Sequence, residues 1–247
     1  MVGFKRMIKS HTIFIRFVIS YFLVLSVTVI IGAIYYHQLL NIYTKDSVKS
    51  GLLSLNNGIQ LVQARFAEVD NMVTQMMLDK EVATLFQRND QPIVNSDYYQ
   101  FRLIQQKLKS YSLTNTFIDE MYLLMDDISV IISSKYVADH LPEFTAHFMN
   151  YEDLTYASWK QQVMDEYHYM DVWPSRLVTK EHIKEAYITY VHSYPTGRFN
   201  SDQGAIVIHI KEEAFTQYFR NMSMMQNGLF LAFDQNNDIL ASYNYNS

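Results

Sequence analysis

The sequence predicts an α+β protein that consists of a transmembrane helix, a long stalk helix and a small domain built on an antiparallel sheet. Three patterns carry this prediction. Residues 17–36 hold no charge, residues 48–76 repeat apolar side chains in heptads, and residues after 118 form short apolar runs between turn residues. In chain order we expect a basic cytoplasmic N-terminus (1–16), a transmembrane helix (17–36), a stalk helix (42–88), a folded module (89–226) and the opening hairpin of a second module (227–247).

The uncharged stretch is long enough to cross a membrane. Its twenty residues, at about 1.5 Å of rise each, form a helix of roughly 30 Å, which is the thickness of the hydrocarbon core. A cleaved signal peptide is the alternative, but its apolar core has about 7–15 residues and is followed by small residues. Here the best cleavage candidate places Ile31 where a small residue is required. We therefore predict a retained membrane anchor.

Charge asymmetry orients this anchor. Four basic residues precede the span and no acidic residue precedes Asp46, so the positive-inside rule keeps the N-terminus in the cytoplasm. Everything after the span is expected outside the cell. The four basic residues are Lys5, Arg6, Lys9 and Arg16.

The outer portion is acidic and free of cysteine. All 25 acidic residues follow position 40, against 16 of the 20 basic residues, which argues against nucleic acid as a partner of this portion. The lack of cysteine excludes a disulfide framework and fits an extracellular domain on a bacterial surface. With 19 Tyr and 15 Phe, aromatic residues are abundant enough for a packed core and for aromatic-lined pockets.

The stalk helix carries an apolar seam that is sustained over four heptads. The residues nearest the membrane have only a second copy of the chain to pack on, so we expect homodimer contact there and contact with the chain's own domain farther along. Gly51 and Gly58 lie on one face of the helix and favour close packing. The expected seam comprises Val48, Leu52, Leu55, Ile59 and Val62, and it continues through Phe66, Val69, Val73 and Met76.

The folded module combines short strands with helices. Apolar residues at helical spacing predict helices, and short apolar runs bounded by Gly, Pro or Asp predict strands. We expect helices at 97–113, 142–166 and 211–225, strands at 118–125, 130–133, 186–194 and 205–210, and a loop at 171–174.

Two predicted hairpins share one pattern. An aromatic-Leu-x-x-Asp strand at 122–126 and an Ile-aliphatic-x-Ser strand at 131–134 recur 108 residues later, at 230–234 and 239–242. The second copy follows a complete module, so it predicts the beginning of another one. On this pattern we expect the chain to be a fragment of a longer protein.

The order of these elements resembles the double Cache sensor region of bacterial receptors, whose modules are PAS-like. More narrowly, the chain is similar to the N-terminal half of membrane-bound AraC-type transcription regulators and of related sensor histidine kinases from Gram-positive bacteria. The resemblance is carried by residues 118–134, 187–195, 204–215 and 228–242. It implies an extracytoplasmic region that binds an unknown small-molecule or protein ligand and signals through the membrane to a cytoplasmic output.

Three functions stay open at this point. The first is the input region of an AraC-type regulator, whose output would show paired helix-turn-helix segments. The second is the input region of a histidine kinase, whose output would show a phosphoacceptor His and a nucleotide-binding fold. The third is a membrane-tethered surface protein without signalling.

Sequence motifs for catalysis, cofactors or metals are weak or missing. Residues 234–238 match the first ligand positions of a calcium loop, but Ile239 stands where Gly is required and Tyr245 where Glu is required. His182 and Glu185 have the spacing of one helical turn without a second His at ligand distance, so we interpret them as a solvated helix face. The sequence has no phosphate-binding glycine loop and no nucleophile elbow. We expect neither enzymatic activity nor a cofactor or metal in this chain.

Candidate ligand contacts are aromatic and polar side chains near the predicted sheet, because small-molecule pockets combine aromatic walls with a few directed polar groups. Residues 156–160 keep the Trp of the amino-acid-binding Cache modules that the chain resembles but lack their Arg and Tyr, so that specificity is not carried over. The candidates are Trp159, Trp173, Tyr187, Tyr190, His192 and Arg198.

Overall fold

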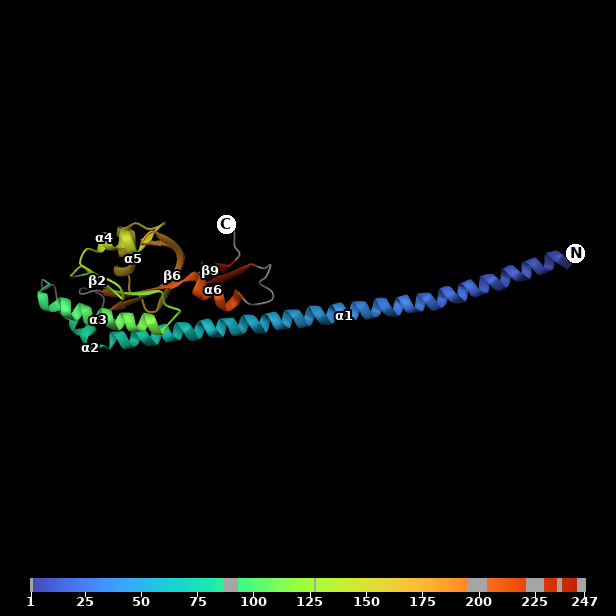
Figure 1. The fold of residues 1–247 in the computed structure, drawn as a ribbon, viewed down its shortest axis with the longest axis horizontal. Coiled ribbons are helices and arrows are strands. Elements are labelled where there is room, and N and C mark those ends of the chain that lie inside the picture. The colour runs from blue at the N-terminus through green and yellow to red at the C-terminus, as the bar shows by residue number, and fades with distance from the viewer. Residues whose placement is uncertain are drawn as a thin grey trace. The chain divides into compact units, whose positions relative to one another are not determined.

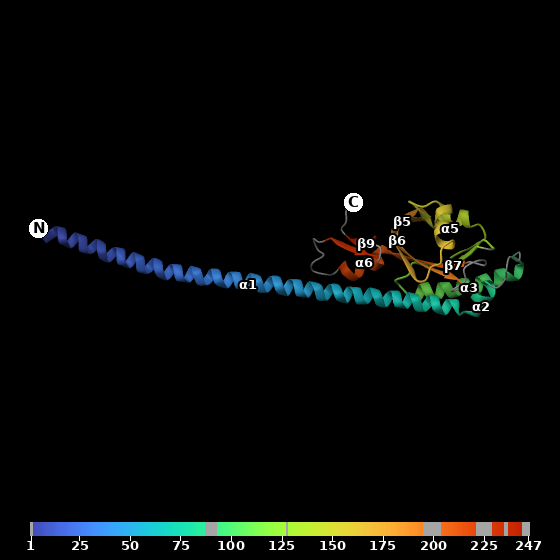
Figure 2. The same cartoon turned by 180° about the vertical axis from the view of Figure 1, so that it is seen from behind.

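The computed structural model describes residues 2–86, 93–126, 128–194, 204–220, 229–234 and 237–243. It contains two units, Met1–Leu53 and Ser54–Ser247, whose elements Figures 1 and 2 show from opposite sides. The described residues of the first unit are all helical and belong to α1 (Val2–Met77). The second unit holds the last part of α1 and all the remaining elements.

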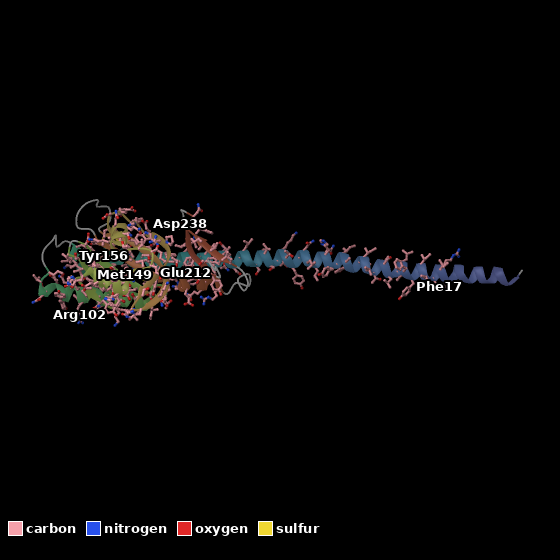
Figure 3. The ribbon with its side chains drawn as sticks, turned by 90° about the horizontal axis from the view of Figure 1, so that it is seen from above. Phe17, Arg102, Met149, Tyr156, Glu212 and Asp238 are labelled. Atoms are coloured by element: carbon pink, nitrogen blue, oxygen red, sulfur yellow. The ribbon has the colours of Figure 1, made fainter. Side chains whose placement is uncertain are left out.

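The first unit carries the helix that was expected to span a membrane. Among the described residues, one helix is long and apolar enough to cross a membrane. Its large apolar side chains, such as Phe17, are exposed along the helix, where lipid would cover them (Figure 3). The hydroxyls of Ser26 and Thr28 donate to the carbonyl oxygens of Leu23 and Val24, so they add no unsatisfied polar group to the span. No Gly or Pro follows between residues 36 and 42, and the helix continues without a break.

The stalk helix ends earlier than the sequence indicates. We expected one helix up to about residue 88, but α1 ends at Met77 and a separate helix, α2 (Lys80–Phe86), follows. Asp79 is the reason, because its Oδ1 accepts hydrogen bonds from the backbone N–H groups of Glu81 (3.0 Å) and Val82 (3.4 Å). A side chain in this position caps the start of a new helix.

The second unit is built on one seven-stranded antiparallel sheet with the order β3-β2-β1-β7-β6-β5-β4. The five main strands, β2-β1-β7-β6-β5, have the order typical of a PAS-like module, and the predicted α+β fold is confirmed. The strands are β1 (Glu120–Met125), β2 (Val130–Ser133), β3 (Val137–Ala138), β4 (Asn150–Tyr151), β5 (Asp171–Lys180), β6 (Ile183–Tyr194) and β7 (Gly204–Lys211).

The helix expected at 142–166 is two helices with a strand between them. These elements are α4 (Leu141–Phe148), β4 and α5 (Tyr156–Met164). Strand β4 pairs with β5 and so interrupts the helical stretch. Thr155 then restarts it as an N-cap, because its side chain accepts a hydrogen bond from the Ser158 N–H at 3.2 Å.

The loop expected at 171–174 is the beginning of β5. The register of β5 against β6 shifts between Trp173 and Arg176, and Pro174 lies inside this irregularity. Proline lacks an N–H group, and at a bulge this does not cost a ladder hydrogen bond. We predicted a loop because of this proline, but the irregularity allows the strand to contain Pro174.

Side chains of the sheet alternate between two covered faces. In β7, Ile206, Ile208 and Ile210 belong to the core that the sheet forms with α1, α2, α3 (Asn95–Thr114) and α6 (Glu212–Arg220), and we call this side the stalk face. Ala205 and Val207 belong to the core on the opposite side, which we call the α4–α5 face. Both cores lie between the sheet and its helices.

Gly204 allows β7 to begin close to its neighbours. A Cβ atom at this position would lie 2.1 Å from the Phe86 ring and 2.4 Å from the carbonyl oxygen of Leu124. The ring is a side chain that moves, but the oxygen belongs to the backbone of β1. Only glycine fits where β7 meets both.

The apolar seam of α1 changes its partner along the helix. Val62 is only 7% exposed and belongs to the stalk-face core, and Leu55 is partly buried against that core. We expected both in a contact between chains, but Val62 packs within its own domain because it belongs to the stalk-face core. Val48, Leu52 and Ile59 remain 47%, 60% and 41% exposed. They are the seam residues that a second chain could cover.

The C-terminal hairpin is a separate two-stranded sheet of β8 (Phe230–Phe233) and β9 (Ile239–Tyr243). It packs against the first module without joining its sheet, since Phe230 stacks on Phe219 of α6 with ring centroids 4.3 Å apart. Helix α6 was expected to reach residue 225, and the part beyond Arg220 lies outside the described residues. The second module stays a prediction.

Two histidines are buried on opposite faces of the sheet. His209 is fully buried, and its Nε2 lies 2.8 Å from the Tyr151 hydroxyl. Burial and then the charge of Lys180 hold the pKa of His209 well below its ordinary value. His192 accepts a hydrogen bond from the Met170 N–H at 3.3 Å, and burial lowers its pKa although Asp70 and Asp171 oppose the shift. Both imidazoles are therefore neutral in the folded protein.

We predict that acid destabilises the domain through these imidazoles. Below about pH 6.5 the unfolded chain binds protons at both, whereas the folded chain does not. As the pH is lowered below this value, the free energy of unfolding decreases by up to about 1.4 kcal/mol per pH unit for each imidazole. Denaturant unfolding of the full chain in detergent micelles, followed by tryptophan fluorescence between pH 7.5 and 5.0, measures this slope.

The variant His209→Gln should have a smaller slope, because its side chain does not titrate. His140→Gln is the matched control, since His140 is largely exposed and should keep the native slope. Equal slopes in His209→Gln and the native chain would contradict the prediction.

Candidate ligand-binding site

A cavity of about 160 Å³ lies on the α4–α5 face, at the end of the sheet where β7 finishes. Its walls come from the start of β1, the β2–β3 connection, α4, the β5–β6 hairpin and the end of β7. The lining residues combine charges of both signs with aromatic rings. They are Asp119, Glu120, Tyr122, Ser133, Lys135, Tyr136, Phe144, Phe148, Lys180, Glu181, Ile183, Glu185, Tyr187 and Lys211.

The β5–β6 hairpin positions one wall of this cavity. Lys180 pairs with Ile183, so the turn has two central residues, Glu181 and His182, with φ of 48° and 73°. Two positive φ angles define a type I′ turn, whose twist matches that of the flanking strands. We had interpreted His182 and Glu185 as a helix face, and this was wrong, because they lie in a turn and a strand.

Lys180 is a largely buried cation in the cavity wall. Its side chain is 15% exposed, and its Nζ is 2.7 Å from Asp119 Oδ2 and 3.9 Å from the centre of the Tyr187 ring. Burial lowers the pKa of Lys180, and Asp119 opposes this shift. Burial also disfavours the charged form of Asp119, but the lysines around it outweigh burial and lower its pKa. The pair stays ionised at neutral pH.

Lys211 extends this pair into a network. Its Nζ lies 2.7 Å from Glu185 Oε2 and 3.8 Å from Asp119 Oδ1. The hydrogen bond from Lys211 lowers the pKa of Glu185, and the same bond raises the pKa of Lys211. Asp119 is therefore shared between two lysines.

Glu120 supports the cavity from behind. It is almost fully buried, and its Oε1 accepts hydrogen bonds from the Ser134 N–H (2.9 Å) and the Ser134 hydroxyl (2.5 Å). Its Oε2 lies 3.3 Å from the Lys135 Nζ. Since both oxygens are engaged, Glu120 holds the β2–β3 connection in place.

Aromatic rings form the remaining wall. Phe148 lies between Phe144 and Tyr136, at centroid distances of 4.9 Å and 4.4 Å. On the other side, the Tyr187 hydroxyl donates to Glu185 Oε2 at 2.8 Å. Burial and then this bond raise the pKa of Tyr187 above its ordinary value, so the phenol stays neutral.

A buried polar group lies beneath this wall. The His209 ring is 5.1 Å from the Tyr122 ring and 5.2 Å from the Tyr187 ring. Its Nδ1 has no hydrogen-bond partner within the part of the chain that the structure describes. Most buried polar atoms are hydrogen-bonded. The Nδ1 atom of His209 departs from this rule and adds a polar atom to the region beneath the cavity.

Tyr187 lines this cavity, but the other candidates from the sequence lie elsewhere. Trp159 is buried in α5 and borders a second cavity of about 130 Å³, which Met149 and Tyr156 also line (Figure 3). Trp173 borders a third cavity of about 510 Å³, near the β8–β9 turn. Arg198 lies outside the described residues.

Tyr190 and His192 lie on the stalk face. They are three and five residues beyond Tyr187 on β6, and alternation turns side chains at odd spacings to the opposite face. The Tyr190 hydroxyl donates to Asp70 Oδ1 of α1 at 2.9 Å. This residue therefore joins the sheet to the stalk helix instead of lining the cavity.

Sequence reasoning missed the charged part of the site. Asp119 and Lys180 are 61 residues apart, and no motif links them to each other or to Lys211. Asp119 directly precedes β1, Lys180 ends β5 and Lys211 ends β7. A charge directly at the end of an apolar strand run was the available signal, although it does not say which strand ends meet.

The arrangement fits a small charged molecule. Charge-assisted hydrogen bonds would orient its ionised groups, and the rings would cover its apolar part. Within the described ranges, no group of three or more His, Asp or Glu side chains could hold a metal ion.

Comparisons with known proteins found similarity to solved structures at low sequence identity. Neither a protein-family model nor a curated protein matches the sequence. The ligand-binding domain of the Campylobacter jejuni chemoreceptor Tlp3, in complex with L-norvaline, is 20% identical over 79% of this chain and 72% of that chain, with a TM-score of 0.43. The V. cholerae histidine kinase DctB sensor domain is 14% identical over 84% and 67% of the two chains, with a TM-score of 0.48. Similarity at this level transfers neither a ligand nor an activity.

Proposed function

We propose that this chain is the extracytoplasmic, ligand-sensing region of a transmembrane signalling receptor, with a binding and not a catalytic role. The observation that carries the proposal is the cavity around Lys180 and Asp119, on the α4–α5 face of a sheet whose other face packs on α1. Strand β6 connects the two sides, since Tyr187 lines the cavity and Tyr190 bonds Asp70 of α1. A change at the cavity thus has a short physical route to the stalk helix.

The ligand we propose is a small zwitterion. An anionic group of the ligand would bind to Lys180, and a cationic group would bind to Asp119 or Glu185. The volume of about 160 Å³ corresponds to about five water molecules in the liquid, which limits the ligand to a small molecule. A concave cavity with few directed polar groups favours such a ligand over a protein.

The output we propose is an AraC-type DNA-binding region, and a histidine kinase is the alternative. Both outputs require an input region outside the membrane, so the described residues are compatible with either output. The sequence of the complete gene distinguishes the two outputs. Paired helix-turn-helix segments would support the AraC-type region. A phosphoacceptor His with a nucleotide-binding fold would support the histidine kinase instead. A surface protein without signalling would carry neither output.

We further propose that the chain forms a homodimer through the membrane-proximal seam of α1. Val48 and Leu52 are exposed and continue the heptad that is buried farther along the helix. A stripe of this kind is stable in water when a second helix covers it.

Ligand binding is tested by isothermal titration calorimetry of the full chain in micelles, with the twenty proteinogenic amino acids, succinate and putrescine as probes. We expect an amino acid to bind, and succinate and putrescine to bind weakly or not at all. Lys180→Met and Asp119→Asn should each weaken binding at least about tenfold, since a hydrogen bond to a charged group contributes about 1.5–3 kcal/mol.

Lys184→Met is the matched control for this experiment. Lys184 lies on β6 near the cavity, but it is half exposed and pairs with Glu152 outside the lining, so its variant should bind as the native chain does. Failure of every probe to bind, or equal affinity of native and Lys180→Met chains, would refute the proposed function.

The orientation is tested with single cysteines in a chain that has none of its own. Ser96 is exposed in α3, so Ser96→Cys should react with a membrane-impermeant maleimide on intact bacteria. Ser10→Cys precedes the span and should react only after lysis. The reverse pattern would place the domain in the cytoplasm.

The dimer is tested by oxidative cross-linking in membranes. Leu52→Cys lies on the seam and should form a disulfide-linked dimer. Ser50→Cys, two residues earlier and about 200° around the helix, should form much less. Equal yields at both positions would show that the seam does not mediate the association.

A further inference from the structure

The end of β7 places neighbouring residues on opposite faces of the sheet. Lys211, the last residue of β7, lines the cavity on the α4–α5 face. Ile208 and Ile210 contribute to the stalk-face core. Glu212, the first residue of α6, continues this alternation and lies on the same side. The two residues are consecutive in the chain, so a backbone shift at Lys211 displaces Glu212 as well.

The carboxylate of Glu212 bridges two separate sheets. Its Oε1 accepts a hydrogen bond from the Ser242 N–H of β9 at 2.5 Å, and its Oε2 accepts one from the Ser175 hydroxyl of β5 at 2.9 Å. Ser175 lies in the irregular part of β5, between Trp173 and Arg176. The labelled Glu212 lies near the hairpin in Figure 3.

The β8–β9 hairpin packs against α6 and β5, and its Ala241 is buried in the stalk-face core. It has no strand pairing with the seven-stranded sheet in the described residues, and a two-stranded hairpin alone is marginal in water. Its contacts with α6 are the Phe230 ring on Phe219 and the Arg220 guanidinium 5.5 Å from the centre of the Tyr243 ring. The bond from Ser242 to Glu212 is a further contact, and Glu212 directly follows Lys211 of the cavity wall.

We propose that Glu212 is a latch that couples the charge network of the cavity to the position of the C-terminal hairpin. Lys211 is held by Glu185 and Asp119. A group that displaces either carboxylate releases the end of β7 and moves Glu212 relative to β9. Hydrogen bonds weaken steeply with distance and misalignment, so a small shift opens the latch. The natural trigger rests on the proposed ligand, but the latch itself is testable without one.

Hydrogen exchange of the full chain in micelles measures the latch. Glu212→Ala should accelerate exchange in Phe230–Phe233 and Ile239–Tyr243 by at least about tenfold, the loss expected for a charged acceptor, with β6 and β7 unchanged. Gln217→Ala is the matched control, since Gln217 is exposed on α6 and its side chain donates to the Ala214 carbonyl oxygen of the same helix. Its hairpin should exchange as in the native chain.

The coupling is measured by combining variants. Glu185→Gln weakens the hold on Lys211, and it should accelerate hairpin exchange about threefold, at the lower end of coupling through a shared backbone shift. In the Glu212→Ala background it should add nothing. Glu152→Gln, which removes the partner of Lys184 outside the cavity, is the control and should leave the hairpin unchanged.

Three results would overturn the proposal: unchanged hairpin exchange in Glu212→Ala, no effect of Glu185→Gln in the native background, or an equal effect in both backgrounds. None of these measurements needs a ligand. Absence of ligand binding with the coupling present would therefore refute the proposed function alone.

Discussion

The antiparallel pairing of β6 with β7 is the constraint on which the rest of the domain depends. Both strands are covered on both faces, so each successive side chain is assigned to one of two environments. Val207 and Tyr187 belong to the core on the α4–α5 face, while Ile208 and Tyr190 belong to the core on the stalk face. A shift of register by one residue would exchange the two sets and move Tyr187 away from the cavity. The separation of a binding side from a stalk side follows from this pairing.

The charges of the cavity have a different physical character from the core around them. Removing Lys180 and Asp119 from water costs free energy, and a buried ion pair repays that cost only partly. Apolar residues of similar size would stabilise the sheet end at least as well. A charged network with an aromatic wall is therefore better explained by recognition than by stability. It also leaves groups that a ligand can engage by exchanging one partner for another.

Local patterns predicted much of the fold and failed where a distant segment intervened. The uncharged span, the heptads and strands β1, β2, β6 and β7 were predicted because their apolar periodicity is a property of the segment itself. The helix at 142–166 was wrong because β5 pairs with β4, and the loop at 171–174 was wrong because a bulge accommodates Pro174. The end of α1 was missed because a single cap at Asp79 divided a continuous apolar pattern.

The sequence by itself determined the long apolar N-terminal helix, the apolar seam and the α+β class, because each follows from composition and spacing within one stretch. Only the tertiary structure decided which part of the seam is buried, since Val62 is 7% exposed and Leu52 is 60% exposed. It also decided the site. Asp119, Lys180 and Lys211 come together through the pairing of β1 with β7, β7 with β6 and β6 with β5. Such pairing joins residues distant in the chain, and periodicity within one strand does not specify its neighbour.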